Sequence, residues 1–232
     1  MEQTTRGAAM ARRALELVHD GDVLGLGTGR AAAAFLRALA ESVRAGLRVR
    51  CVPTSRATEA AARDLGVPLV SLEEAGELDL AFDGADEIDP ALDLVKGLGG
   101  ALLRERIVAS AARRFVVLAG TEKLVGTLGE RGNLPVEVVT FGWTLCQRRL
   151  EVLGCRPRLR ASGAGPFVTD NGNYVLDCGV DPIADPGGLQ GSIGAIPGVV
   201  GTGLFLGMAD TAILEDERGG VTVRHRARDE GR

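Results

Sequence analysis

The chain has 232 residues, of which 45% are hydrophobic, 25% are charged and only 3% are aromatic. This length suits one large domain or two modest ones, and Ala, Leu and Val must build most of the core. The net charge is -4, and no long basic block precedes the C-terminal RHRAR, which argues against a nucleic-acid partner. Four scattered cysteines and two histidines, with no Cys-x-x-Cys pair, argue against a zinc site and favour a reducing compartment.

The sequence predicts no membrane partner. No apolar run approaches the ~20 residues that a membrane-spanning helix needs. The N-terminal stretch MEQTTRGAAMARRALELVHDGD lacks the apolar core of a signal peptide. We therefore expect a cytoplasmic protein.

The first half of the chain alternates predicted helices with short buried strands. Apolar residues at helical spacing predict helices at residues 7–19, 30–46, 55–66 and 100–114. Short apolar runs predict strands at residues 23–27, 47–52, 78–82 and 115–120. This alternation is typical of an open parallel α/β sheet with Rossmann-like βαβ units.

From about Leu134 the predicted strands and helices no longer alternate regularly. Strands are predicted for PVEVVTF, RPRLRAS, FVTD and YVLDCG, and helices for TLCQRRLEVLG and GGLQGSIGAI. This order predicts a smaller α+β (ferredoxin-like) domain, after which TGLFLGMADTAILED returns to the first sheet. The expected organisation is an α/β domain at 1–130 with 204–225, a small domain at 131–203, and a polar tail at 226–232.

The stretch GLGTGRAAAAF, residues 25–35, follows a predicted strand and opens a predicted helix. Glycines let a ligand approach the backbone, and a helix N-terminus offers free N–H groups to an anion. The third glycine comes one residue too early for a dinucleotide fingerprint, and no acid ends the second strand. A site for phosphate or sugar hydroxyls fits better, and a tight turn without a ligand stays open as an alternative.

Asp83 and Asp86 follow the apolar strand residues of LDLAFDGADEIDP, residues 78–90. Open α/β sheets bind ligands at the carboxyl ends of their strands. Two carboxylates there could bind sugar hydroxyls, move a proton or hold Mg2+, or could form an ordinary Asx-rich turn. Glu87 and Asp89 are expected to be solvated.

KGLGGALLRERI, residues 96–107, combines a cation, a glycine loop and a carboxylate. Lys96 and the loop N–H groups could surround an anion, and the helix that starts near Gly100 directs its positive end there. Glu105 lies in the first turns of this helix. The alternative is a solvated lysine followed by a favourable first-turn acid.

Taken together, these residues suit proton abstraction next to a carbonyl. A base that removes such a proton leaves negative charge on oxygen, and this charge needs donors that are already in place. Glu105 would be the base, and Lys96 with the glycine loop would supply the donors, as in aldose–ketose interconversion.

Several motifs resemble the A type of ribose-5-phosphate isomerase. GLGTGRAAAAF resembles the family's G-[LIV]-G-T-G-S-T-A loop, DLAFDGADEIDP its D-G-A-D-E turn, and LVKGLGGALLRERIV its K-G-G-G-A-A-L-x-x-E-K-I segment. The resemblance continues in order through AGTEKLV, LPVEVV, VTDNGNYVLD and IPGVVGTGLF. It therefore covers nearly the whole chain.

The resemblance implies an intramolecular oxidoreductase that interconverts D-ribose 5-phosphate and D-ribulose 5-phosphate through an enediolate, in the non-oxidative pentose phosphate pathway. Glu105 would move the proton between C1 and C2, Asp83 would assist ring opening, and Lys96 would stabilise the enediolate. The other implied substrate contacts are Thr28, Gly29, Arg30, Ala31, Gly84, Ala85, Asp86, Gly97, Leu98, Gly99 and Lys123. Among these, Asp86 would bind hydroxyls and Lys123 would approach the phosphate. The family uses no metal and no organic cofactor, and it forms homodimers or dimers of dimers.

Two departures from the family pattern bear on the substrate. Arg30 and Ala31 replace a Ser-Thr pair, and Leu98 stands where a glycine is usual, which restricts φ and adds bulk. The same scaffold would suit an amino-sugar-phosphate deaminase, a CoA-transferase-like enzyme or a non-catalytic sugar-phosphate-binding module. These alternatives stay open on the sequence alone.

Five arginines give the second predicted domain a basic local character. They are Arg148, Arg149, Arg156, Arg158 and Arg160. We expect a solvated face, with a subunit or phosphate contact as the alternative. Trp143 and Tyr174 are expected to pack in this domain.

Overall fold

The computed structural model describes residues 7–227, and the chain divides into two compact units. Unit 1 contains the described residues up to Ala85, then Arg104–Lys123 and the residues from Met208 onward. Unit 2 contains Asp86–Leu103 and Leu124–Gly207. This division differs from the expected domain boundaries, which assigned 86–103, 124–130 and 204–207 to the first domain.

Strand pairing explains why these segments join unit 2. Three short strands, β4 (Glu87–Ile88), β5 (Leu94–Val95) and β13 (Leu204–Phe205), form a separate antiparallel sheet. The chain after the Asp83 turn therefore pairs with a segment about 110 residues later, a long-range contact that local sequence patterns do not report.

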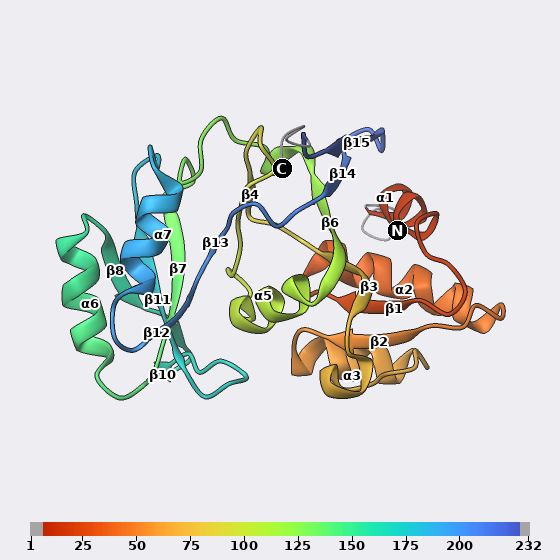
Figure 1. Cartoon of the computed structure of the whole chain (residues 1–232), viewed down its shortest axis with the longest axis horizontal. Helices are drawn as coiled ribbons and strands as arrows, with labels where there is room; N and C mark the ends of the chain where they lie inside the picture. Colours follow the sequence, from red (N-terminus) through yellow and green to blue (C-terminus); the bar gives the residue numbers. More distant parts are fainter. Residues whose placement is uncertain (1–6, 228–232) are drawn as a thin grey trace. The chain divides into compact units, whose positions relative to one another are not determined.

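Unit 1 is built on a six-stranded sheet with the order β15-β14-β6-β3-β1-β2 (Figure 1). Its strands are β1 (Val23–Leu26), β2 (Arg50–Pro53), β3 (Leu78–Asp83), β6 (Ala112–Gly120), β14 (Thr211–Glu215) and β15 (Val221–His225). The strands β2, β1, β3, β6 and β14 are parallel, and β15 is an antiparallel edge strand. The expectation of an open, mostly parallel sheet is confirmed.

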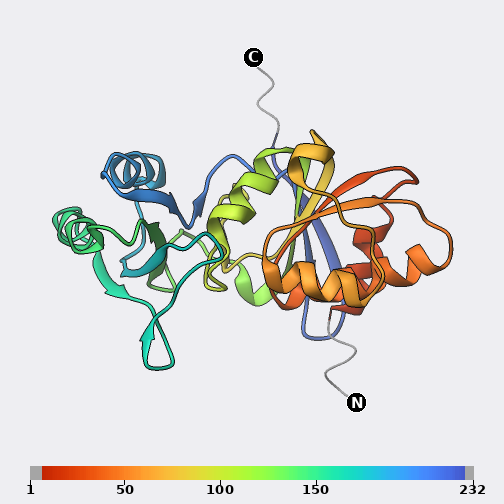
Figure 2. The same cartoon turned by 90° about the horizontal axis from the view of Figure 1, so that it is seen from below.

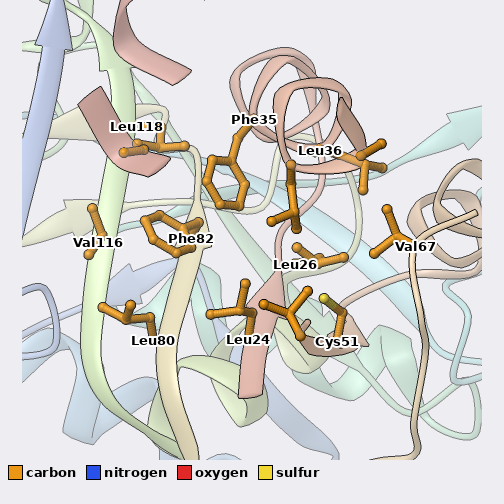
Figure 3. Close-up of a cluster of buried hydrophobic side chains, with 14 of the residues drawn as sticks. Leu24, Leu26, Phe35, Leu36, Cys51, Val67, Leu80, Phe82, Val116 and Leu118 are labelled. Atoms are coloured by element: carbon orange, nitrogen blue, oxygen red, sulfur yellow. The ribbon is translucent and has the colours of Figure 1, made fainter. Parts of the chain in front are cut away.

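The helices of unit 1 lie beside this sheet, and the longer ones bury apolar side chains against it. They are α1 (Ala8–Leu15), α2 (Arg30–Arg44), α3 (Arg56–Asp64), the short α4 (Leu72–Ala75) and α5 (Leu102–Ser110), which begins in unit 2; the 3-10 helix η2 (Thr121–Lys123) follows β6. Phe35 of α2 stacks on Phe82 of β3 with ring centroids 4.2 Å apart, above Leu24 and Leu26 of β1 (Figure 3).

Two segments of unit 1 differ from the predictions. The predicted helix at 100–114 ends at Ser110, because Ala112 and Arg114 pair with Leu78 and Leu80 of β3. Residues 221–225, for which no strand was predicted, form β15, which extends the sheet through its pairing with β14.

Unit 2 contains a four-stranded antiparallel sheet with the order β12-β7-β11-β8. Its strands are β7 (Asn133–Val138), β8 (Arg156–Leu159), β11 (Tyr174–Gly179) and β12 (Val199–Thr202), and its helices are α6 (Trp143–Val152) and α7 (Pro186–Gly194). Both helices lie on the same face of the sheet (Figures 1 and 2). The βαββαβ order confirms the ferredoxin-like expectation.

A short hairpin connects β8 to β11. It consists of β9 (Ala161–Ser162) and β10 (Gly165–Pro166). The predicted strand FVTD is absent from the described residues: there, only an isolated bridge joins Val168 to Tyr174. Trp143 and Tyr174 do pack as expected, edge-on with ring centroids 6.4 Å apart.

Candidate active site

In unit 1, polar residues lie at the carboxyl ends of the parallel strands. Open α/β sheets bind ligands at this edge. Thr28 follows β1, Thr54 follows β2, Asp83 ends β3, and Lys123 lies in the 3-10 helix after β6. Because β2, β1 and β3 are neighbours in the sheet, the first three of these residues lie together.

The Asp83 carboxylate is held against the loop that follows β1. The residue is only 3% exposed, and its Oδ1 accepts hydrogen bonds from the Thr28 N–H at 3.0 Å and the Gly84 N–H at 2.7 Å. A Cβ at Gly27 would lie 2.1 Å from this same oxygen. Only glycine at position 27 therefore leaves room for the carboxylate.

A cluster of hydroxyl groups supports the same loop from the other side. Thr28 Oγ1 lies 2.9 Å from Thr54 Oγ1 and 3.2 Å from Thr58 Oγ1, and it donates to Ser55 Oγ at 2.8 Å. Thr58 Oγ1 also donates to the Gly27 C=O at 2.9 Å. Thr54, Ser55 and Thr58 were not among the predicted site residues; the run of hydroxyl residues in PTSRAT, directly after a strand, was the available signal.

Glu105 lines the same narrow pocket as Asp83. Its lining also includes Gly25, Gly27 and Thr54. Glu105 is 5% exposed, so it is not the solvated first-turn acid of the alternative interpretation. Helix α5 reaches this position because a glycine faces it: a Cβ at Gly25 would lie 2.5 Å from Val108 Cγ1.

The other predicted residues of unit 1 lie outside the lining of this pocket. Arg30 begins α2 and is exposed, after Gly29 at a φ of 105°. Ala31 and Lys123 are half-buried. Gly84 and Ala85 are half-buried in the turn after β3, where Gly84 contributes its N–H to Asp83. Contact of these residues with a substrate stays a prediction.

Burial raises the pKa of the Cys51 thiol, on β2, to about 12, so this thiol is not ionised near neutral pH. Within the described range, no group of three or more His, Cys, Asp and Glu side chains could hold a metal ion. No helix in the same range has the length and apolar character to cross a membrane.

Unit 2 contains the glycine loop, residues 96–100. Lys96 is only 3% exposed, its N–H donates to the Gly203 C=O at 2.8 Å, and its Nζ lies 5.5 Å from the centre of the Phe205 ring. The alternative interpretation of Lys96 as a solvated lysine is therefore wrong.

Asp86 binds this loop directly. Its Oδ2 accepts a hydrogen bond from the Leu98 N–H at 3.0 Å, while its own N–H donates to the Val95 C=O at 2.8 Å. Asp86 thus orients the loop. The neighbouring Glu87, expected to be solvated, is 1% exposed and accepts hydrogen bonds from the Gly129 and Arg131 N–H groups, so that expectation was wrong.

The structure explains how the loop accommodates Leu98. The left-handed positions of the loop are Gly97 and Gly100, with φ of 106° and 81°. Leu98 lies outside this strained region, and its side chain is 50% exposed. Gly100 is required, because a Cβ there would lie 2.4 Å from Cζ of Phe167. Gly100, which stands at an alanine position of the family motif, therefore lies where the backbone needs a glycine.

Comparison with known proteins identifies what the chain resembles. The family described as "Ribose 5-phosphate isomerase A (phosphoriboisomerase A)" matches residues 50–219. A protein named ribose-5-phosphate isomerase A from Roseiflexus castenholzii is 57% identical over 216 residues, which cover 92% of each chain.

Solved structures agree with this similarity. Ribose 5-phosphate isomerase A from Methanocaldococcus jannaschii superposes with a TM-score of 0.90 at 38% identity, over 97% of this chain and 99% of the other. A D-ribose-5-phosphate isomerase in complex with phospho-erythronic acid superposes with a TM-score of 0.92 at 35% identity, again over 97% and 99% of the two chains.

The close approach at Gly27 predicts a stability effect. Gly27→Ala should lower the free energy of unfolding by about 1–3 kcal/mol, because the added methyl group must displace the Asp83 carboxylate. The control is Gly191→Ala in α7, where a Cβ meets nothing within 4 Å and should stabilise the helix by up to ~1 kcal/mol. Chemical denaturation measures both. Equal stability of Gly27→Ala and the wild type would contradict the described packing of Asp83.

Proposed function

The chain belongs to the ribose 5-phosphate isomerase A family, and on this basis we propose that it interconverts D-ribose 5-phosphate and D-ribulose 5-phosphate. The observation that carries the proposal is that two buried carboxylates, those of Asp83 and Glu105, line the same pocket of unit 1. A carboxylate base on a helix and a second carboxylate at a strand end can carry out the proton transfers of an aldose–ketose interconversion.

In the proposed reaction, the Glu105 carboxylate removes the proton from C2 of the open-chain aldose. The electrons of that C–H bond form the C1–C2 double bond of an enediolate, and negative charge develops on O1. Glu105 then returns the proton to C1, while a proton moves from O2 to O1, which yields the ketose. Asp83 assists ring opening and the proton transfer between the oxygens.

The proposed role of the glycine loop rests on the motif that the chain shares with its family. Lys96 and the loop N–H groups would stabilise the enediolate oxygen, and Asp86 would bind hydroxyls or orient the loop. Thr28 to Ala31, Gly84, Ala85 and Lys123 would complete the substrate contacts, with Lys123 toward the phosphate. We further propose that the reaction needs neither a metal nor an organic cofactor and serves the non-oxidative pentose phosphate pathway in the cytoplasm.

A coupled assay tests the reaction class and the metal requirement together. The wild type should convert ribose 5-phosphate to ribulose 5-phosphate at the same rate with and without excess EDTA, because the proposed chemistry uses carboxylates and fixed donors only. Parallel assays with an amino sugar phosphate and with an acyl-CoA address the deaminase and transferase alternatives. Turnover of either compound in place of ribose 5-phosphate, or binding of ribose 5-phosphate without conversion, would contradict the proposal.

Replacement of the proposed base gives a sharper test. Glu105→Gln preserves the shape of the side chain but removes its basicity, so kcat should fall by about 10²–10⁴-fold. Binding of phospho-erythronic acid, the ligand of a solved relative, should survive and can be measured by calorimetry. Glu151→Gln, at an exposed position on α6, is the matched control. A kcat near the wild-type value for Glu105→Gln would rule out the role assigned to Glu105.

We also propose that the chain forms a homodimer, or a dimer of dimers, through unit 2. Of the nine exposed large apolar side chains among the described residues, five fall within residues 139–153. Phe141 and Val152 stand out, with 91% and 86% exposure. Such exposed apolar residues are typical of interfaces between proteins.

Light scattering coupled to gel filtration tests this assembly. The wild type should have a mass of two or four times 24.2 kDa. Phe141→Glu should reduce it, because a charge would be buried in the interface. The control is Arg158→Glu, which changes an exposed residue on β8. A monomeric wild type would refute the assembly, and an unchanged mass for Phe141→Glu would refute the role of this segment.

A further inference from the structure

Arg160 differs from the other arginines of its region because its side chain turns inward. The residue follows β8, and its side chain is 13% exposed, whereas Arg156 and Arg158 on the same strand are exposed. The expectation that all five arginines of this region form a solvated face is therefore wrong for Arg160.

The guanidinium of Arg160 joins strand β11 to the glycine loop. Its Nε and Nη2 donate to the two carboxylate oxygens of Asp177, at 2.8 and 2.6 Å. Its Nη1 donates to two backbone carbonyls, those of Gly97 and Leu98, both at 3.1 Å. Four of its five N–H donors are thus engaged within the protein, and the charge of Asp177 balances that of the guanidinium.

The loop that Arg160 contacts has few hydrogen bonds of its own. The Gly100 N–H donates to the Gly97 C=O at 3.0 Å, and Asp86 accepts from the Leu98 N–H. Phe167 completes the support: its ring occupies the space that a Cβ at Gly100 would need, and the ring centre lies 5.7 Å from Cζ of Arg160. Arg160 and Asp86 therefore hold the Gly97–Leu98 peptide from its two opposite ends.

Because the peptide group is planar, the contact between Arg160 and the Leu98 C=O also fixes the direction of the Gly99 N–H. A trans peptide points its C=O and its N–H in opposite directions. Because Arg160 binds the Leu98 C=O, the Gly99 N–H in the same peptide group points away from Arg160. Gly99 is exposed, and in the described part of the chain its N–H donates to no other backbone carbonyl.

We propose that Arg160 is a positioning residue, which fixes the Leu98–Gly99 peptide so that the Gly99 N–H serves as a donor to an anionic oxygen of the reacting sugar phosphate. This inference rests on the proposed function. Arg160 acts here through geometry rather than charge, because Asp177 already neutralises it. A donor fixed before the reaction stabilises developing charge without a reorganisation cost, so the effect should appear in kcat.

Steady-state kinetics of conservative variants test the inference. Arg160→Lys keeps the charge opposite Asp177 but loses the planar fork that reaches two carbonyls at once. We expect kcat for ribose 5-phosphate to fall by about 10- to 100-fold, with KM close to the wild-type value. The reason is that a displacement of the donor by about 1 Å can slow the chemical step by up to about 100-fold. The control is Arg156→Lys, which changes an exposed arginine of β8 that pairs with Asp181, and which should keep wild-type kcat.

Chemical rescue supplies a readout that a purely structural role would not give. Methylguanidinium added to Arg160→Ala should restore part of kcat, whereas it should leave Arg156→Ala unchanged. A wild-type kcat in Arg160→Lys would overturn the inference. A raised KM at unchanged kcat would also overturn it, because it would indicate a direct contact with the substrate.

A second variant covers the case in which the Arg160 variants do not fold. Asp177→Asn weakens the anchor of the guanidinium while its contacts to the two carbonyls remain available. It should lower kcat at unchanged KM, and a wild-type kcat there would overturn the inference. Failure of the wild type to convert ribose 5-phosphate would overturn both the proposed function and this inference. An active wild type together with an unaffected Arg160→Lys would overturn the inference alone.

Discussion

The contact between the Asp83 carboxylate and the backbone of the loop after β1 is the constraint on which the site in unit 1 depends. The carboxylate approaches so closely that position 27 cannot carry a side chain, and the Thr28 N–H completes the contact. A carboxylate held by backbone N–H groups keeps a fixed direction. The parallel sheet supplies the arrangement, because β1 and β3 end side by side at the same edge.

The position of the Glu105 carboxylate depends on a similar close approach two residues earlier, at Gly25. Gly25 lies within β1, and its missing side chain lets α5 pack against the strand through Val108. Glu105 is on the same helix, so its distance from the sheet is set by that packing. Two glycines of one short strand and loop, Gly25 and Gly27, thus determine where Glu105 and Asp83 lie.

The glycine loop of unit 2 is likewise built from backbone groups. Its conformation depends on left-handed φ at Gly97 and Gly100, and its peptides are bound by Asp86 and Arg160. The side chain of Leu98 plays no part in these contacts and faces outward. A departure from the family pattern at this position therefore changes the surface of the loop and leaves its hydrogen bonds in place.

The sequence predicted those features of the fold and of the site that depend on residues close together in the chain. The alternation of strands and helices, Asp83 at a strand end and Glu105 on the following helix all follow from hydrophobic periodicity and spacing. The helix that contains Glu105 was predicted to continue to residue 114, because residues 111–114 contain no helix breaker. Their strand conformation instead comes from pairing with β3. Likewise, the burial of Glu87 and Arg160 depends on partners about 42 and 17 residues away, which periodicity does not detect.

The placement of the aromatic residues has a practical consequence for spectroscopy. The chain has one tryptophan and one tyrosine, Trp143 and Tyr174, and these two rings meet edge to face within unit 2. Emission excited near 295 nm therefore reports on the ferredoxin-like unit alone, and the parallel-sheet unit, whose aromatic residues are phenylalanines, is silent at that wavelength. Intrinsic fluorescence thus follows the unfolding of the ferredoxin-like unit, whereas far-ultraviolet circular dichroism follows the secondary structure of the whole chain, so a difference between the two transitions would show that the units melt separately.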